Sequence, residues 1–548
     1  MYEYIKINNK DKFVNHLNEM KNEKCVSIYG DEKFGFIILN NKYFKPLLLK
    51  KEFIAENYKL IEKELNEINI LIFFDAKKDL KMLLKNNIKI YTKLFDCNLA
   101  KKIIGFNANR LTETTIINNI EESINKNMEL VKQLEKTRLT FVNKIKELKV
   151  EKIAEIEFSC VKGIAEMENT GFRIDIIKWY KLIKEYEKEL NKKAIEISDF
   201  FSNNGIQISL FGENNEIKKY IHSNKKVIEK LKEYGIDTDT SSKKFLAQYK
   251  ENEFVKTLLE YRELDKIYNS SLISITNKIE AEMIYPEYSQ IGAGSGRMSC
   301  SNPNIQQIPR EKNIRECFLP SDKENVFVIA DYSQIELRVV AEISKDIKMI
   351  EAYKKQMDLH STTASLLLEK DISKIDKNER QAAKAINFGL IYAMGADGLK
   401  RYCENVFNIK LSIEMSNKVR NRFLEVYEGV REWQNTIKRS NPITARSLAG
   451  RPFKYSTKDG LASKCNIPVQ GTAADIIKEA IGKVYENLKD KDAKLVAVIH
   501  DEIIIETNKN DAEEIKIILK QTMENVSKDY MRNVPLVAEA VISNCWIK

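Results

Sequence analysis

Residues 494–506 read KLVAVIHDEIIIE, and this stretch limits the possible folds of the chain more than any other. Two apolar runs, LVAVI and IIIE, are joined by so few residues around His500 and Asp501 that only a tight turn between antiparallel strands fits. The sequence therefore predicts a β-hairpin with Asp501 and Glu502 at its tip. Because Asp is a common turn residue, these acids alone do not establish a site.

A second carboxylate follows a predicted strand in the stretch VFVIADYSQIEL, residues 326–337. Apolar and small residues lead directly to Asp331, which indicates a buried strand that presents a carboxylate at its end. Glu336 begins a predicted helix that packs back against this strand. Taken alone, Asp331 is equally well explained as a turn residue or a helix cap.

The stretch RQAAKAINFGLIYA, residues 380–393, places Arg380, Lys384, Phe388 and Tyr392 at intervals of four. On a helix with 3.6 residues per turn, these side chains form a slanting row that can contact one elongated ligand. Arg and Lys suit phosphate oxygens, and aromatic rings suit a base or a sugar. A nucleoside triphosphate has this layout, although the buried stripe of an amphipathic helix explains the row better if it is taken alone.

Together, the three stretches contain the components of a phosphoryl-transfer site. Carboxylate oxygens and substrate phosphates are the ligands that Mg²⁺ prefers. Two such ions, about 3.5 to 4 Å apart, clamp the attacking and the leaving oxygen of an in-line displacement. We therefore expect Asp331 and Asp501 to bridge two Mg²⁺ ions, and Lys384 to protonate the departing pyrophosphate.

The composition indicates a large protein of several domains. A chain of 548 residues is too long for one core, and it has no apolar run of about 18 residues that could span a membrane. Eight cysteines without a CxxC pair argue for a reducing compartment and against a zinc site. Because the first residues also lack a signal-peptide core, we expect a cytoplasmic protein. The excess of 90 basic over 80 acidic residues is compatible with a polyanionic partner but does not establish one.

The motifs resemble those of family A DNA polymerases, the bacterial DNA polymerase I group. Each motif is weak alone, but their joint order and spacing, from about residue 150 to the C-terminus, are specific. The matching stretches are DYSQIELR (331–338), RQAAKAINFGLIYAMGADGL (380–399) and VIHDEI (498–503) as motifs A, B and C, with LLEYRELDKI (258–267), SGRMSCSNPNIQQIPR (295–310), DLHSTTA (358–364) and NIPVQGTAAD (466–475).

The resemblance implies an α/β and α+β multidomain fold, in which a ribonuclease H-like exonuclease-type domain precedes a right-hand polymerase. It also implies a template-directed DNA polymerase that uses two Mg²⁺ ions, deoxynucleotides and primer-template DNA, works as a monomer and serves replication or repair. The expected ranges are 1–135 for the exonuclease-like domain and 136–548 for the polymerase, with the thumb at about 150–285, the palm at about 286–345 and 441–548, and the fingers at about 346–440.

The resemblance also assigns roles to individual residues. Asp331, Asp501 and the backbone carbonyl of Tyr332 would bind the metals, with Glu502 as an accessory acid. The residues implied to contact the nucleotide are Arg380, Lys384, His360, Phe388, Tyr392, Gln334 and Glu336, of which Glu336 would exclude a ribose 2′-hydroxyl. Those implied at the primer terminus and the minor groove are Arg297, Asn466, Gln470 and His500. The minor groove suits a polymerase because every correct pair presents acceptors there in nearly the same places.

Three positions depart from the family pattern. Ala462 stands where an Arg is usual, and this puts one minor-groove contact in doubt, although Lys464 is close enough in sequence to replace it. Ala393 replaces a common Gly, and Glu428 replaces a common Pro. None of these positions belongs to the expected metal or triphosphate sites.

The first 135 residues lack the acids that a 3′-5′ exonuclease needs. No Asp-x-Glu occurs in the first 150 residues, and neighbouring strand residues such as Asp31 and Glu32 face opposite ways. FFDAKKDL keeps Asp79 of the second exonuclease motif but has Asp75 in place of Asn, and NIEES (119–123) lacks the acid of the third motif. We therefore expect a domain that keeps its fold without hydrolytic activity.

Two other functions remain open at this stage. A single-subunit RNA polymerase shares the two-acid palm, but Glu336 favours deoxynucleotides. A catalytically dead DNA-binding relative would not need Asp331, Lys384 and Asp501 together. The chain starts at the exonuclease-like part with no separate 5′-nuclease domain, which leaves a phage, organellar or bacterial source open.

Overall fold

The N-terminal part of the protein is built on a six-stranded mixed sheet with strand order β1-β4-β3-β2-β5-β6. The computed structural model describes residues 3–21, 25–105, 120–201, 215–407 and 409–547. In the sheet, β2, β5 and β6 run parallel, and β3 is antiparallel to both β2 and β4. The strands are β1 (Ile5–Ile7), β2 (Cys25–Asp31), β3 (Phe36–Asn40), β4 (Leu47–Lys50), β5 (Ile70–Phe73) and β6 (Lys93–Asp96).

Helices cover both faces of this sheet, as the strand β3 shows. Ile37 and Leu39 belong to one buried cluster, and Phe36 and Ile38 belong to another, because alternate strand residues face opposite sides. The first cluster includes residues of α1 (Lys10–Lys21), α2 (Lys51–Asn66) and α3 (Ala76–Lys85), and the second includes residues of α4 (Cys97–Ile103) and α5 (Ile120–Glu147).

Two long helices connect this part to the rest of the chain. The helix α5 passes the boundary expected near residue 135, and Phe141 and Ile145 near its end still pack in the N-terminal core. The next helix, α6 (Glu151–Thr170), packs Val161 and Ala165 against the N-terminal part and Ile164 against the central core. The N-terminal unit therefore extends to about Glu147, and α6 is shared by both parts.

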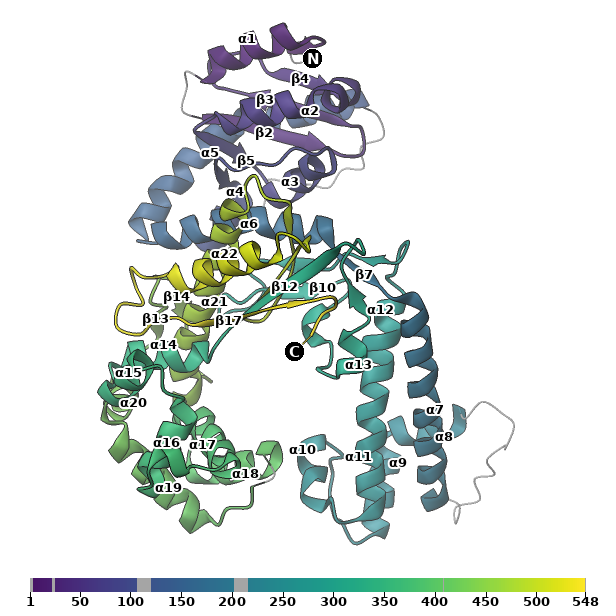
Figure 1. Cartoon of the computed structure of the whole chain (residues 1–548), viewed down its shortest axis with the longest axis vertical. Coiled ribbons are helices and arrows are strands. Elements are labelled where there is room, and N and C mark those ends of the chain that lie inside the picture. Colours follow the sequence, from purple (N-terminus) through teal and green to yellow (C-terminus); the bar gives the residue numbers. More distant parts are fainter. Residues whose placement is uncertain (1–2, 22–24, 106–119, 202–214, 408, 548) are drawn as a thin grey trace.

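A four-stranded antiparallel sheet, β15-β16-β12-β17, forms the centre of the molecule (Figure 1). The predicted hairpin is confirmed, since β15 and β16 pair and enclose His500 and Asp501. The predicted strand and helix around Asp331 are confirmed as β12 and α14. The bounds are β12 (Asn325–Tyr332), β15 (Ala493–Ile499), β16 (Glu502–Asn508), β17 (Ala538–Ser543) and α14 (Ile335–Ser344), with α21 (Leu461–Asn487) and α22 (Ala512–Asn525) packed against the sheet.

Two helical arms extend from the central sheet on opposite sides (Figure 1). One arm consists of α15 (Ile347–Lys354), α16 (Leu359–Leu368), the 3₁₀ turn η5 (Ile372–Lys374), α17 (Lys377–Leu390), α18 (Ala396–Phe407), α19 (Ile413–Val426) and α20 (Glu428–Ser440). The other consists of α7 (Ile176–Phe201), α8 (Asn215–His222), α9 (Asn224–Glu233), α10 (Lys243–Leu246), η2 (Ala247–Tyr249), α11 (Glu253–Asp265), the π-helical η3 (Lys266–Ile273) and α12 (Ser274–Thr276).

Short strands and turns complete the junctions between these parts. They are β7 (Phe172–Ile174), β8 (Met283–Ile284) and β11 (Phe318–Leu319) in one sheet, the pairs β9 (Glu287–Ser289) with β10 (Ser299–Ser301) and β13 (Thr444–Arg446) with β14 (Pro452–Lys454), and the turns η4 (Ile305–Gln307) and α13 (Lys312–Arg315). Of the described helices, none is both long and apolar enough to cross a bilayer.

Four buried charges join α6 to α21. The Glu157 carboxylate accepts from Arg451 at 2.5 Å and from Lys478 at 2.6 Å, and Arg451 also donates to Asp475 at 2.7 Å. All four side chains are buried, so each depends on the others for charge compensation. Removing one partner from such a group typically costs about 3 to 5 kcal/mol. The cluster therefore fixes α6 against the helix that lies beside the central sheet.

Candidate functional site

Asp331 and Asp501 lie next to each other on paired segments of the central sheet. Asp331 is opposite Glu502 in the β12–β16 register, and the Tyr332 amide donates to the Asp501 carbonyl at 3.3 Å. Burial raises the pKa of the Asp501 carboxyl to about 6, and the charges of Asp331 and Glu336 add to this effect. Two carboxylates that repel each other in this way favour a bound cation.

This pair suits a metal that is shared with a substrate. Among the described residues, no group of three or more His, Cys, Asp or Glu side chains is placed to hold a metal ion. Mg²⁺ needs few protein ligands when phosphates supply the remaining oxygens, so two acids are sufficient for such a site. The donor set therefore fits Mg²⁺ held jointly with a phosphorylated ligand.

The two neighbouring residues expected at the metals have different surroundings. The Tyr332 side chain is buried and its hydroxyl donates to the Met523 carbonyl at 2.8 Å, so only its backbone is available to a metal. The Glu502 carboxylate is also buried and accepts from the Trp546 indole at 2.8 Å. Glu502 does not line the pocket beside Asp501. Glu502 is nevertheless the cross-strand partner of Asp331, so it lies beside the expected metal ligands while Trp546 holds its carboxylate.

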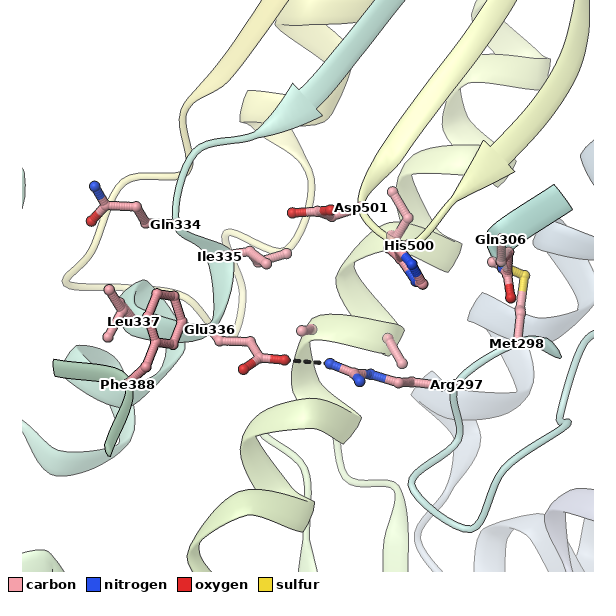
Figure 2. A pocket seen from close by; sticks show the side chains of 13 residues that line it. Arg297, Met298, Gln306, Gln334, Ile335, Glu336, Leu337, Phe388, His500 and Asp501 are labelled. Atoms are coloured by element: carbon pink, nitrogen blue, oxygen red, sulfur yellow. Dashed lines mark hydrogen bonds and ion pairs between the residues drawn. The ribbon is translucent and has the colours of Figure 1, made fainter. Parts of the chain in front are cut away.

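A cavity of about 340 Å³ opens beside Asp501 and contains several of the predicted residues (Figure 2). Arg297 and Glu336 point toward each other across it and form an ion pair. The Tyr392 hydroxyl donates to the second Glu336 oxygen at 2.6 Å, so both oxygens of this carboxylate are held. The predicted residues that line the cavity are Arg297, Gln334, Glu336, Phe388, His500 and Asp501.

The helix α17 carries the predicted cationic row, and its Phe388 lines this cavity. The Arg380 guanidinium donates to both Asp358 oxygens at 2.9 Å, whereas Lys384 forms no ion pair with any described residue. The helix ends at Leu390, so Tyr392 lies beyond it and not on its last turn. The physical reason is at Ala393, whose φ of 58° is left-handed and cannot continue the helix.

His360 faces the cationic row from α16 as a neutral ring. Burial lowers the pKa of His360 to about 4, the charges of Arg380 and Lys384 lower it further, and Asp358 opposes them. The Asn387 amide lies 3.0 Å from Nδ1 and donates to it in the neutral ring, so that Nε2 carries the proton. The Phe388 ring packs beside the His360 ring, with 5.9 Å between the ring centres. The imidazole therefore offers a hydrogen-bond donor without a charge.

Comparison with known proteins identifies the family. Residues 177–548 match the family model described as DNA polymerase family A. The chain belongs to this family of DNA-directed DNA polymerases. The family resemblance drawn from the sequence motifs is therefore confirmed. The division into thumb, palm and fingers stays a prediction; below, the central sheet with α21 and α22 is called the palm, and the arm from α15 to α20 is called the fingers.

Curated relatives extend the comparison beyond this family region. DNA polymerase I of Aquifex aeolicus is 36% identical over 402 residues, which cover 72% of this chain and 67% of the relative. DNA polymerase I of Caldicellulosiruptor bescii is 30% identical over 566 residues, which cover 96% of this chain and 61% of the relative. That of Bacillus subtilis is 29% identical and only 46% of it is covered. The chain thus spans about half to two thirds of these relatives.

A solved structure shares the fold over nearly the whole chain. The POL domain of Pol1 from M. smegmatis, in complex with DNA primer-template and dNTP, superposes with a TM-score of 0.78 and covers 99% of both chains. The sequence identity is 20%, so this likeness concerns the fold. It includes the N-terminal sheet as well as the polymerase region.

The residues expected on the DNA side lie on two palm segments. His500 sits in the hairpin turn, where burial and the charges of Arg297 and Arg310 lower the pKa of its ring. Asn466 and Gln470 are four residues apart on α21, one helical turn beyond Ala462. They share a face of the helix with that alanine and do not line the cavity.

Lys464 does not take the place of the arginine that is missing at Ala462. Its side chain is buried and its ammonium donates to Asn441 at 2.6 Å. It also lies two residues from Ala462, which places it on a different face of α21. The minor-groove contact in question therefore has no replacement from this lysine.

Sequence reasoning missed two residues of the site. Gln306 lines the cavity and its backbone hydrogen-bonds His500, but only its position in the stretch SNPNIQQIP indicated it. Asp358 begins the stretch DLHSTTA, from which only His360 was selected. Its contact with Arg380 joins residues 22 positions apart, and no local pattern shows such a contact.

Proposed function

We propose that this chain extends a primer 3′ end with deoxynucleotides on a DNA template, using two Mg²⁺ ions. The observation that carries the proposal is that Asp331, on β12, lies beside Asp501 in the adjoining hairpin turn, and that Asp501 lines a cavity together with Phe388 of the cationic helix α17. A site for metal-assisted phosphoryl transfer needs these two components: acids for the ions and cations for the phosphates.

In this proposal Asp331, Asp501 and the Tyr332 carbonyl hold the ions. When bound, the ions supply charge stabilisation at the attacking and leaving oxygens. Arg380 neutralises the triphosphate, and Lys384 donates a proton to the departing pyrophosphate. His360 donates a hydrogen bond from Nε2, as its neutral ring allows.

Glu336 selects the sugar in this proposal. Arg297 and Tyr392 hold its two carboxylate oxygens, so the side chain cannot easily move away from an incoming ribose. A fixed carboxylate excludes a 2′-hydroxyl by its volume. Phe388, whose ring lines the same cavity, packs against the sugar and base.

The primer-template duplex is the proposed macromolecular partner. Arg297, His500, Asn466 and Gln470 are polar side chains of the palm that can donate to acceptors of the minor groove. Because these acceptors occupy nearly the same places in every correct pair, the contacts test the shape of a pair without reading its sequence. The protein is proposed to act as a monomer.

We further propose that the N-terminal part is a degenerate exonuclease domain that serves as a platform. Its acids are engaged in structural contacts: Asp31 accepts from Ser123 at 2.6 Å, and Asp96 accepts from the Ala76 and Leu99 amides at 2.8 Å. Asp79 is buried, and burial holds the pKa of its carboxyl well above the usual range. Glu32 pairs with Lys85.

A lysine stands among the acids of the degenerate site. The Lys78 ammonium lies 3.3 Å from the Tyr29 hydroxyl. Although partial burial opposes it, Tyr29 and the nearby charges of Asp79 and Asp31 raise the pKa of Lys78. A fixed positive charge beside these carboxylates disfavours a second cation at the same place. Asn119 of the third exonuclease stretch lies outside the described residues.

Primer extension with purified protein tests the proposed function. The protein is incubated with primer-template DNA, Mg²⁺ and either deoxynucleotides or ribonucleotides, with Asp331→Asn as the inactive reference. Template-directed addition of deoxynucleotides supports the proposal. Addition of ribonucleotides at equal rates would indicate an RNA polymerase, and DNA binding without extension would indicate a catalytically dead relative.

A further inference from the structure

Asp358 joins the fingers helix α17 to the palm segment that follows Asp331. Its Oδ1 accepts from Arg380 at 2.9 Å and from the Gln334 amide at 3.2 Å. Its Oδ2 accepts from Arg380 at 2.9 Å and from the Ser361 amide at 2.8 Å and hydroxyl at 2.7 Å. Burial opposes ionisation, but the hydrogen bonds of Arg380 and Ser361 lower the pKa of Asp358 to about 2. Asp358 is therefore a charged carboxylate at neutral pH.

The second connection runs through Gln334. This residue has a left-handed φ of 55° immediately before α14, and it lies three positions after Asp331. The Tyr353 hydroxyl donates to the Gln334 side-chain oxygen at 3.1 Å, while the Gln334 amide donates to Asp358. Asp358 thus contacts both Gln334, which lines the cavity, and Arg380, which lies on the same helix as the cavity residue Phe388.

Arg380 is not available in full to a triphosphate while this pair is intact. The pair is bidentate, and it uses Nε and one terminal nitrogen of the guanidinium. An incoming triphosphate therefore meets a cation whose charge is already compensated, and a carboxylate that repels phosphate oxygens. Both the Arg380 and Asp358 side chains are partly exposed, at 44% and 31%, so that an anionic ligand can reach them.

We propose that Asp358 is a positioning residue whose carboxylate serves as the resting counter-ion of Arg380 and is displaced by the incoming nucleoside triphosphate. The inference rests on the proposed polymerase function. A ligand with several negative charges can compete for the guanidinium, whereas a ligand with one charge cannot compete well with a bidentate carboxylate. Asp358 thereby weakens nucleotide binding and holds Arg380 in place until a triphosphate arrives.

A structural role for Asp358 is separable from this proposal. Asp358 is also the N-cap of α16, and an asparagine at an N-cap is as favourable as an aspartate. The Asp358→Asn variant therefore retains the cap and the shape while it removes the charge. If capping is the only role of Asp358, this variant binds nucleotide as the original protein does.

Single-nucleotide incorporation at several deoxynucleotide concentrations tests the proposal. We expect Asp358→Asn to lower KM roughly 3- to 10-fold, as for the loss of one partly exposed charge pair, while kcat changes less than KM. In an Arg380→Ala background the same substitution should lower KM by a clearly smaller factor, because only the direct repulsion between the carboxylate and the phosphates is left to remove. The control Glu369→Gln removes one negative charge from the same arm, where Glu369 pairs with Arg422 at 2.6 Å, and should leave KM unchanged.

An unchanged or higher KM in Asp358→Asn would overturn the proposal, and so would an effect of equal size in the Arg380→Ala background. Absence of incorporation by the original protein would instead contradict the proposed function. In that case calorimetric titration with inorganic tripolyphosphate still tests Asp358: tighter binding by Asp358→Asn supports the displacement, and equal or weaker binding refutes it.

Discussion

The palm and the N-terminal part each place acidic residues at the ends of sheet strands, but they use them differently. In the palm, Asp331 lies at the end of β12 beside Asp501, and Asp501 lines a cavity. In the N-terminal part, Asp96 ends β6 and caps α4, and Asp31 ends β2 and accepts from Ser123. Carboxylates at strand ends are therefore common to both regions, but those of the palm lie side by side, whereas those of the N-terminal part are engaged in structural contacts.

The causes of the raised pKa values show the same difference. Burial raises the pKa of Asp501 to about 6 and that of Asp96 to about 7. For Asp501, one backbone amide opposes burial, and two carboxylates, Asp331 and Glu336, raise the pKa further. For Asp96, three backbone amides of α3 and α4 oppose burial, and one carboxylate, Asp75, raises the pKa further. Amide contacts thus predominate at Asp96, while carboxylate repulsion, which a cation would relieve, has a larger share at Asp501. A raised pKa alone does not distinguish a catalytic acid from a structural one.

The largest expected effect separates the acids of the two regions. Asp331→Asn or Asp501→Asn should lower the rate of nucleotide addition by at least about 10³-fold, the upper end for loss of one transition-state contact. Primer-template affinity should stay nearly the same, because it comes mainly from phosphate contacts. The matched control, Asp79→Asn in the N-terminal part, should keep the original rate. Rapid-quench primer extension measures the rate of nucleotide addition by all three variants. A rate within tenfold of that of the original protein for either palm variant would contradict the assignment of these acids to the metals.

The next expected effect concerns Lys384, the cation of α17 that is proposed to act with the two palm acids. Lys384→Ala should lower kcat roughly 10²-fold, since the leaving pyrophosphate loses its proton donor. Lys377→Ala, an exposed lysine on the first turn of the same helix, serves as the control and should leave kcat unchanged. Equal rates for Lys384→Ala and the control would show that Lys384 is a surface cation.

A smaller effect concerns selectivity within the palm cavity. Glu336→Ala should raise the use of ribonucleotides relative to deoxynucleotides roughly tenfold or more, because a volume that excludes the 2′-hydroxyl is lost. The Glu336→Gln variant is the control: it keeps the volume of the side chain but removes the charge that contacts Arg297 and Tyr392, so it separates the loss of volume from the loss of charge. Competition assays with both nucleotide types give the ratio. If both variants discriminate as the original does, another side chain excludes the hydroxyl.

The smallest effect concerns the stability of the N-terminal part. The folded pKa of Asp96, about 7, lies above the ordinary value near 4, so the folded state holds the proton more tightly. Its contribution to stability is therefore present in full below pH 4 and is lost as the pH rises toward 7. Asp96→Asn keeps the cap to Leu99 but sets an NH₂ group against the Ala76 amide, which costs about 1 to 3 kcal/mol at any pH, and it removes the titrating group. Denaturant unfolding at pH 5 and pH 8 measures this: from pH 5 to pH 8 the free energy of unfolding should fall by about 1 kcal/mol or more in the original protein relative to the variant, and an equal change in both proteins would contradict the assignment.

Much of the palm could be predicted from the sequence because its signals are local. The hairpin around His500 and the strand before Asp331 depend on apolar runs and a short turn, which a single stretch contains. The Arg380–Asp358 pair and the Glu502–Trp546 contact join distant segments, so no periodic pattern shows them. The extension of α5 past residue 135 has a similar cause, since tertiary packing of Phe141 decides where that helix belongs.

The role of Ala393 illustrates a different limit. The sequence showed that a common glycine was replaced, but not that the backbone still takes the left-handed φ of 58° there. Because an alanine tolerates this conformation at a cost of roughly 1 kcal/mol, the surrounding contacts must hold it. Local preference favoured a longer helix, and the fold ended it at Leu390.

One measurement tests most directly whether metal-dependent chemistry belongs to the palm alone. The protein is incubated with Mg²⁺ and a 3′-mismatched primer-template, first without nucleotides and then with all four deoxynucleotides on a matched primer. We expect no shortening in the first reaction and extension in the second, with extension lost in Asp501→Ala. Metal-dependent shortening from the 3′ end that persists in Asp501→Ala would contradict it, because the N-terminal part would then hold a working metal site.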